Sequence, residues 1–271
     1  MPGSEDAARA EALADRLILR LTSVEVGLRP GAAGRLFELL EIPTAVDVLQ
    51  ALVARREAGV QPATETLAAV VECLWSLGET ETVSALYEEA RRRNVTAACR
   101  LLMRPPAQRI YNPLEEQGVD RQMRDVALGR RKALARGRDP VVLGRLMRDP
   151  DPQVIRNLLA NPRLTEDEVV RIAATRPAKG TVLAEIFLNR RWGVRQRVRR
   201  ALVRNPYTPT ALGLKLVQIL PLTDVREVMR DGKLHEELRR AAGDRVREAR
   251  RRREIAKAAA NLADVEPLGD A

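Results

Sequence analysis

Aromatic residues, cysteine and histidine are scarce in this sequence of 271 residues. Aromatic residues make up 3% of the chain, which has two cysteines, Cys73 and Cys99, and one histidine, His235. The core must therefore be built mainly from Leu, Val, Ile and Ala. Two cysteines and one histidine supply neither a disulfide framework nor a zinc ligand set. We therefore expect buried free thiols, no metal and no other cofactor.

Long apolar runs are also missing. No stretch approaches the 18 residues that a membrane-spanning helix requires, and acidic residues at Glu5 and Asp6 stand where a signal peptide carries positive charge. The sequence therefore predicts a soluble, cytoplasmic protein with no membrane partner. No small-molecule substrate is evident from any motif.

Lysine is rare as well, since Arg outnumbers Lys by 42 to 5. Residues 1–100 carry a net charge of −4, whereas residues 101–271 carry +14. This asymmetry favours an anionic partner for the second half of the chain. The drift of composition in a GC-rich genome would also produce an excess of arginine, so both explanations stay open.

Apolar residues recur with the period of an α-helix and are interrupted by Pro and Gly. Residues 5–28 show one such stripe at Leu13, Leu17 and Leu21, and Arg29-Pro30-Gly31 is expected to end that helix. No segment alternates as a strand does. We predict an all-α chain without a sheet.

The segment from Gly59 to Val95 has the pattern of a helical hairpin, with a turn at Leu77-Gly78-Glu79. It resembles a single tetratricopeptide or pentatricopeptide unit. The pentatricopeptide resemblance would imply RNA binding. The net negative charge of this half favours the protein-binding family of the two.

A short phrase recurs in the second half, as Asp139-Pro140, Asn161-Pro162 and Asn205-Pro206. The steps are 22 and 44 residues, and residues 154–162 correspond to residues 198–206. Such a period is typical of stacked supersecondary units. We predict that residues 139–245 form a stacked unit in which Asn161 and Asn205 occupy equivalent turns.

Helix-start signals accompany the repeat. Thr165 and Glu168 have the spacing of a capping box, and Thr208-Pro209 is expected to cap another helix. Acidic residues in the first turn of a helix complement its dipole, so residues 166–168 need no catalytic role.

Residues 135–245 resemble the leucine-rich repeat variant and HEAT-like repeats of bacteria. The resemblance implies an α-solenoid that serves as an interaction surface, although the cysteine-rich iron–sulfur segment of the founding variant protein has no counterpart. The residues that carry it are Asp149-Pro150-Asp151-Pro152-Gln153-Val154, Leu158-Leu159-Ala160-Asn161-Pro162 and Ala201-Leu202-Val203-Arg204-Asn205-Pro206.

These patterns predict a helical-hairpin region followed by a solenoid. The expected divisions are an N-terminal helical domain (1–104), a linker (105–118), a basic repeat solenoid (119–255) and a C-terminal tail (256–271).

One arginine-rich segment is the candidate binding site for an anionic partner. Residues 190–204 contain seven arginines and no acid, and Val194, Val198, Ala201 and Leu202 form an apolar stripe opposite several of them. Acids on neighbouring helices or an anionic partner could balance this charge. The candidate residues are Arg190, Arg191, Trp192, Arg195, Arg197, Arg199, Arg200 and Arg204.

Three functions compete. The first is a non-enzymatic scaffold that binds another protein, which could be acidic, through its repeat surface. The alternative is nucleic-acid binding by the arginine-rich half. A third is the DNA glycosylase activity known among HEAT-like proteins, which would need an acid beside tryptophans such as Trp75 and Trp192. We favour the first, with no catalytic residues and no metal ligands.

Overall fold

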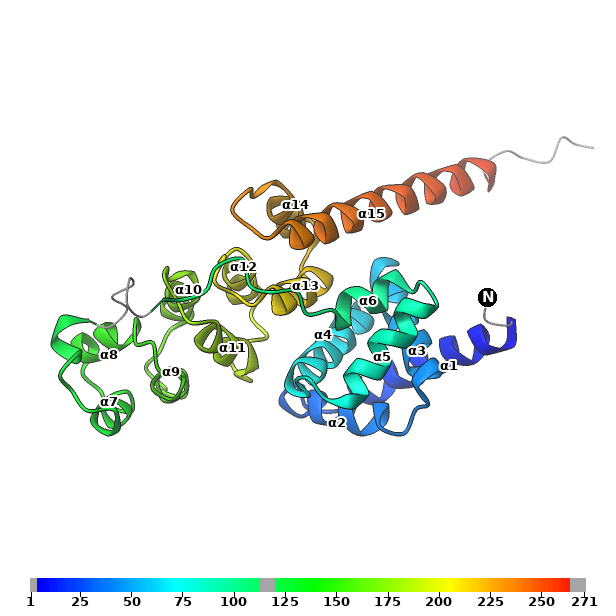
Figure 1. Ribbon diagram of the computed structural model, residues 1–271. Helices are drawn as coiled ribbons and strands as arrows, with labels where there is room; N and C mark the ends of the chain where they lie inside the picture. Colours follow the sequence, from blue (N-terminus) through cyan, green and yellow to red (C-terminus); the bar gives the residue numbers. More distant parts are fainter. Residues whose placement is uncertain (1–3, 113–119, 264–271) are drawn as a thin grey trace, which may run out of the picture.

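The computed structural model describes residues 4–112 and 120–263. Within these residues the chain forms fifteen α-helices and two short 3-10 helices, and no strand (Figure 1). The prediction of an all-α chain is confirmed for the described part.

The first half is a bundle of six helices. Helices of alternate number pack side by side, with α1 on α3, α3 on α5 and α2 on α4. The elements are α1 (Ser4–Thr22), η1 (Val26–Leu28), α2 (Arg29–Phe37), α3 (Ile42–Glu57), α4 (Gln61–Ser76), α5 (Glu81–Arg92) and α6 (Thr96–Leu102).

The two helices predicted at 59–95 are α4 and α5, but they are not a closely packed pair and so do not form the predicted hairpin; the 35-residue step from Val60 to Val95 has a structural cause. Gly59 (φ +83°) and Asn94 (φ +57°) both adopt the left-handed conformation that ends a helix. The next residues then bond back in the same way, Val60 N to Arg55 O at 3.2 Å and Val95 N to Ala90 O at 2.8 Å. Two helix ends with the same backbone geometry therefore lie 35 residues apart.

The expected helix end at Arg29-Pro30-Gly31 is wrong. The first helix stops at Thr22, and Arg29 begins α2 with Pro30 in its first turn. Proline lacks only an amide hydrogen that the first turn of a helix leaves unbonded, so it starts a helix as readily as it ends one.

The second half is a run of shorter helices and one long one. The 3-10 helix η2 precedes them. The elements are η2 (Arg121–Met123), α7 (Leu128–Leu134), α8 (Pro140–Leu146), α9 (Pro152–Leu159), α10 (Glu166–Ala174), α11 (Gly180–Leu188), α12 (Gln196–Val203), α13 (Thr210–Ile219), α14 (Leu222–Arg230) and α15 (Glu236–Ala263).

Helices of alternate number also pack together here. Helix α9 lies between α7 and α11, and α10 packs on α12, so successive helices zigzag between two rows (Figure 1). A short helix cannot bury its apolar face alone, and in these pairs the neighbour two places along covers part of that face.

A recurring turn ends these helices. The side-chain oxygen of an Asn or Asp accepts a hydrogen bond from the backbone amide two residues later, at 2.9–3.1 Å. Such a turn closes the chain locally without a helix or strand partner. It is made by Asp149, Asn161, Asn189, Asn205 and Asp231.

Asn161 and Asn205 are equivalent, as predicted, but Asp139 is not a third copy. Asp139 caps the start of α8, whereas Asn161 follows α9 and Asn205 follows α12. The 44-residue step thus spans three helices rather than a whole number of hairpins. The turn therefore recurs after individual helices, and a two-helix hairpin is not the repeating unit.

The two predicted caps had different outcomes. Thr165 and Glu168 form the complete capping box at the start of α10. Thr208 caps nothing, because its hydroxyl donates to Leu202 O at 2.6 Å and α13 begins after Pro209.

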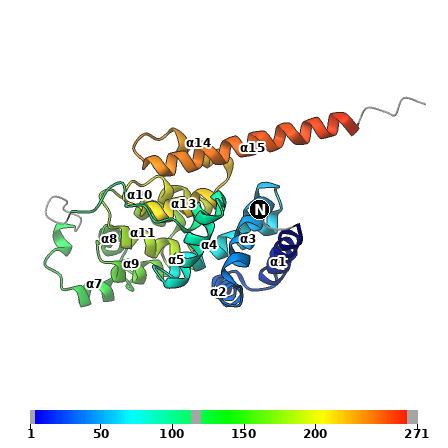
Figure 2. The same cartoon turned by 45° about the vertical axis from the view of Figure 1, so that its right-hand side comes forward.

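Helix α13 joins the two halves. Every residue from Thr210 to Ile219 is buried, and the helix packs on α4, α6, α12 and α15. The chain leaving α6 also runs back along the second half, where Arg109 N bonds to Pro206 O at 3.1 Å. Helix α15 packs on α13 and α14 at its start, and its far end extends away from the other helices (Figures 1 and 2).

Candidate arginine surface

The predicted arginine segment does not form one helix face. Helix α12 begins only at Gln196, so Arg190, Arg191, Trp192 and Arg195 lie in the connection that precedes it. Asn189 folds this connection by accepting hydrogen bonds from the amides of the next residues. The eight candidate residues therefore face several directions.

Trp192 is a core residue. Its side chain is 3% exposed and its Nε1 donates to Leu159 O at 2.9 Å. The Arg191 guanidinium lies 4.2 Å from the ring centroid, a cation–π contact. The hypothesis that Trp192 stacks on a base or on a partner's guanidinium is not compatible with this burial.

Arg199 points inward, toward the first half of the chain. Its Nε donates to Gly193 O at 2.6 Å, and burial lowers its pKa to about 10. The carboxylate that opposes this effect belongs to Glu72 on α4, whose own pKa burial raises to about 6. Arg199 thus belongs to the joint between the halves, and it is not part of an outer surface.

Three other candidates meet carboxylates on neighbouring helices, which is one of the two ways in which their charge could be balanced. Arg197 pairs with Asp167 at 2.7 Å, and Glu227 lies between Arg200 at 2.7 Å and Arg204 at 3.1 Å. These acids stand on α10 and α14, the two helices beside α12. They are about 30 positions away in the sequence, so no inspection of the segment alone could find them.

Some arginines that sequence reasoning did not select form a more continuous surface. An open cavity of about 600 Å³ lies between α8 and α10 and is lined by Arg148, Arg171 and Arg176 but by no carboxylate of the described residues. Each of the three side chains is exposed. Guanidinium groups that face water at one concave place have the chemistry needed to bind an anionic group.

The arginine surface continues onto α12. Arg176 donates from Nη2 to Arg204 O at 2.6 Å, which places it beside the pair that holds Glu227. We call this set the arginine row. It consists of Arg148, Arg171, Arg176, Arg200 and Arg204.

The two ends of the arginine row differ in one position. Arg171 on α10 precedes buried Ile172, and Glu227 on α14 precedes buried Val228, so both side chains hold the same place relative to the core. At the α12–α14 contact this place supplies a carboxylate to two arginines. At the α8–α10 contact it supplies another arginine, and the positive charge there has no partner within the described chain.

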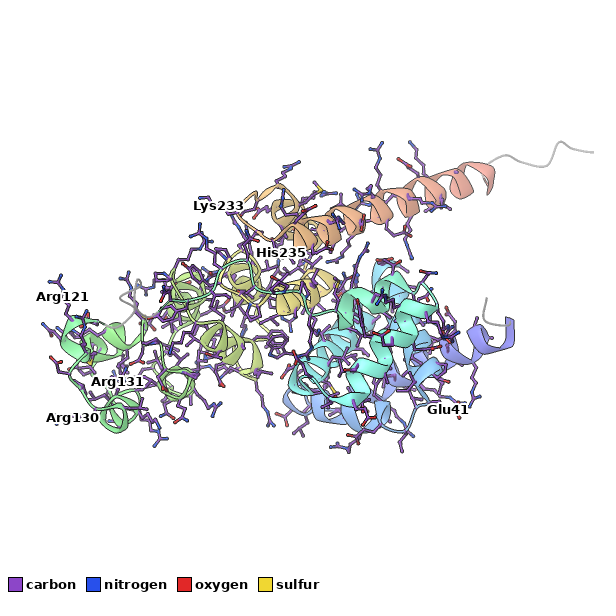
Figure 3. The ribbon with its side chains drawn as sticks, viewed as in Figure 1. Glu41, Arg121, Arg130, Arg131, Lys233 and His235 are labelled. Atoms are coloured by element: carbon purple, nitrogen blue, oxygen red, sulfur yellow. The ribbon has the colours of Figure 1, made fainter. Side chains whose placement is uncertain are left out.

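Further basic residues lie at the end of the molecule formed by η2, α7 and α8. Figure 3 labels Arg121, Arg130 and Arg131 there. Arg131 is engaged, because its Nη1 lies 2.5 Å from Asp149 Oδ2. His235 accepts a hydrogen bond from Glu237 N through Nδ1 at the start of α15.

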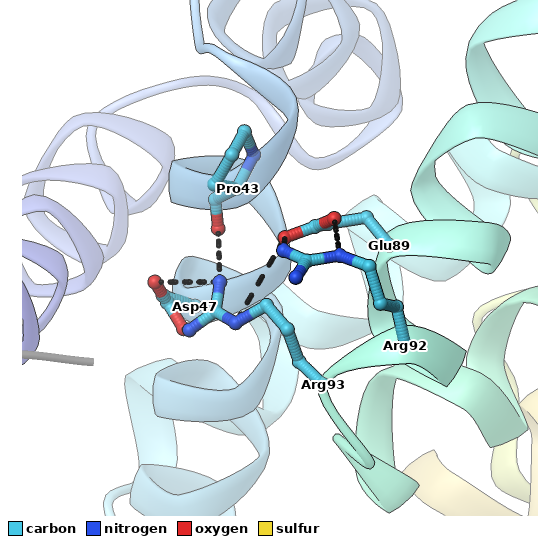
Figure 4. A network of polar contacts seen from close by, with 5 residues as sticks. All are labelled: Pro43, Asp47, Glu89, Arg92 and Arg93. Atoms are coloured by element: carbon cyan, nitrogen blue, oxygen red, sulfur yellow. Dashed lines mark hydrogen bonds and ion pairs between the residues drawn. The ribbon is translucent and has the colours of Figure 1, made fainter. Parts of the chain in front are cut away.

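The first half holds a larger groove of about 1040 Å³, lined by residues of α3, α5 and α6. Four of its charged side chains pair with one another, as Figure 4 shows: Arg93 binds Asp47 through two nitrogens, and Arg92 binds Glu89 at 2.7 and 2.9 Å. These paired groups have little charge left for a ligand.

The two cysteines line neither of these cavities. Cys73 is buried and Cys99 partly buried, both as free thiols, and burial raises the pKa of Cys73 to about 11. The described residues contain no group of three or more His, Cys, Asp or Glu that could hold a metal. No helix among them is long and apolar enough to cross a membrane.

A scan against protein-family models finds no match, and comparisons with curated proteins and with solved structures find none either.

Proposed function

We propose that this protein is a non-enzymatic α-solenoid that binds an acidic segment of another protein along the arginine row. The solenoid would be built from HEAT-like or variant repeats. Its support is the packing of several helices on the one two places along and the recurring Asn or Asp turn. The observation that carries the binding role is the unpaired positive charge at Arg148, Arg171 and Arg176.

An ion-paired carboxylate within the chain is a precedent for such binding. Glu227 is held between Arg200 and Arg204 with contacts of 2.7 and 3.1 Å. A carboxylate from a partner would meet the same chemistry at the α8–α10 cavity, where the equivalent position is Arg171. Forked guanidinium donors match carboxylates well, which suits an acidic peptide.

The surroundings of the arginine row favour a protein over nucleic acid. Proteins that hold single strands stack bases on exposed aromatic faces. Trp192 is buried, and the Tyr111 ring near the cavity is covered by Lys179, whose Nζ is 5.6 Å from its centroid. Trp75 is partly buried, with Arg104 at 6.0 Å from its ring.

A titration with three labelled probes tests this proposal. A glutamate-rich peptide, a single-stranded RNA and a duplex DNA would be titrated at low salt and followed by fluorescence anisotropy. We expect micromolar binding of the peptide. Replacing Arg148, Arg171 and Arg176 by Gln should abolish it.

The matched control changes the net charge equally. Arg16, Arg20 and Arg91 are exposed on α1 and α5, and their replacement by Gln should leave peptide binding intact. If the nucleic acids bound and the peptide did not, the alternative of nucleic-acid binding would replace our proposal. Equal losses in both triple variants would show a general charge effect and no site.

A further inference from the structure

Two arginines are buried where α15 crosses α3 and α13. Arg56 is 7% exposed and Arg245 is 6% exposed. Arg56 donates from Nη2 to Gln218 Oε1 at 3.1 Å, and Arg245 donates from Nη1 to Val217 O. The Nε atoms of both are buried without a hydrogen-bond partner among the described residues. Buried guanidinium groups are normally satisfied more fully.

The negative charge near these two arginines is too small to balance their positive charge. Glu57 lies 3.6 Å from Arg56 and 2.9 Å from Arg252, so one carboxylate serves two arginines and faces a third. Burial, together with the charge of Arg56, lowers the pKa of Arg245 to about 8. Arginine nevertheless keeps its proton at neutral pH. The buried positive charge is therefore uncompensated, and its burial costs free energy.

Beside these groups is an open cavity of about 490 Å³ between α3, α6, α13 and α15. Arg245 lines it. The charged residues of its walls are the cations Arg100, Arg245, Arg247, Arg251 and Arg252 and the acids Glu57, Asp244 and Glu248.

Cations in these walls outnumber acids by two, and Arg56 behind the wall adds a third positive charge. Asp244 already forms ion pairs with Arg100 and Arg247, and Glu248 forms one with Arg252. Arg251 is exposed and has no ion pair with a described residue. The excess is therefore concentrated on Arg245, Arg251 and buried Arg56.

We propose that this cavity binds a small dianionic oxyanion of the phosphate class, either inorganic phosphate or the phosphoryl group of a small metabolite. A doubly charged ion matches the excess charge of the walls, and its tetrahedral oxygens can accept from several guanidinium groups at once. An exposed row of arginines suits an extended segment, whereas a recess with a buried arginine in its wall suits a compact ion.

Binding there would join the two halves of the protein. The walls belong to α3 and α6 of the first half and to α13 and α15 of the second, so one ion would contact side chains from both. The ion would be expected to fix α15 against the six-helix bundle. This site is independent of the arginine row.

The experiment uses the full chain and inorganic phosphate as the probe. Thermal unfolding would be followed at pH 7.5 with increasing sodium phosphate, the ionic strength being held constant with sodium chloride. We expect a saturable rise of the Tm with phosphate and none with chloride. Titration calorimetry would give the affinity, and glucose 6-phosphate in place of phosphate would show whether an esterified phosphoryl group also fits.

Two variants locate the site. Arg245→Met should weaken phosphate binding at least tenfold, on the order of one lost charge-assisted contact, yet unfold at an equal or higher temperature in phosphate-free buffer. Arg251→Gln changes only an exposed wall residue and should weaken binding several-fold. The triple Gln variant of Arg148, Arg171 and Arg176 should keep the full phosphate response.

The proposal would be overturned if phosphate and chloride had equal effects on the wild-type protein, or if Arg245→Met and Arg251→Gln both kept the wild-type affinity. Loss of the response in the arginine-row variant would equally overturn it, because the ion would then sit on that row.

Discussion

Asn161 and Asn205 make the same three hydrogen bonds in turns that lie 44 residues apart. Each Nδ2 donates to two carbonyl oxygens of the helix two places earlier, at 2.8 and 2.9 Å for Asn161 and at 2.9 Å twice for Asn205. Each Oδ1 accepts from the amide two residues later. One buried side chain thus satisfies the end of a neighbouring helix and shapes its own turn.

Replacing Asn205 by Ala should lower the free energy of unfolding by about 2–4 kcal/mol, because two buried carbonyls and one amide lose their partner. Asn157→Ala is the matched control. Asn157 is only partly buried, donates one bond to Lys132 O and accepts one from the exposed Arg136 side chain, so its loss should cost about 1 kcal/mol or less. Urea denaturation of the two variants measures the difference, and equal costs would contradict this account of the turn.

Lys215→Met should stabilise the protein. Lys215 is 1% exposed on α13 and has no hydrogen bond or ion pair with a described residue, and burial lowers its pKa to about 7 from 10.5, with Arg104 adding to the effect. The penalty is complete below pH 7, where the folded protein must hold the charge. It is lost between pH 7 and 10.5, where the unfolded chain binds the proton and the folded protein does not.

The gain from Lys215→Met should therefore be largest at pH 6–7, on the order of a few kcal/mol, and should shrink as the pH approaches 10. Denaturant unfolding at several pH values measures it. Lys233→Met, at an exposed position, serves as the control and should show no such pH-dependent gain. A variant at Lys215 that is less stable than wild type at pH 7 would refute the prediction.

Glu227→Gln should strengthen binding of an acidic peptide, because it frees Arg204 for a partner and leaves Arg200 only its 3.5 Å contact with Asp224. The cost in stability should be below about 1 kcal/mol, since these ion pairs are half exposed. Glu185→Gln removes a comparable partner, that of Arg156 between α9 and α11, and should leave peptide affinity unchanged. Anisotropy titration compares the two, and unchanged affinity in both would count against the arginine row.

Gly193→Ala should destabilise the protein strongly. A Cβ at this position would lie 1.9 Å from Phe187 O and 3.1 Å from Asn189 O, so the backbone of the α11–α12 connection would have to move. Gly144→Ala, inside α8 with open space around it, should instead stabilise by up to about 1 kcal/mol. Thermal unfolding of the two variants should shift the Tm in opposite directions.

The sequence by itself determined the helices and many of their ends. Period-3.6 patterning, Gly59 and the capping box at Thr165 are local signals, and the structure contains each of them. The correspondence between Asn161 and Asn205 could also be recognised in the sequence, because equivalent turns need the same side chain. Proline was ambiguous, since Pro30 fits the first turn of a helix as well as a position after its end.

Only the tertiary structure decided which charges meet. The arginines at 197, 200 and 204 find Asp167 and Glu227 because helices two places apart lie side by side, while Arg148, Arg171 and Arg176 gather where no carboxylate faces them. Helix formation depends on neighbours within a few residues. The balance of charge on a surface depends also on residues of helices that lie two places away in the sequence. Which of these residues come close together is decided by the packing of the helices.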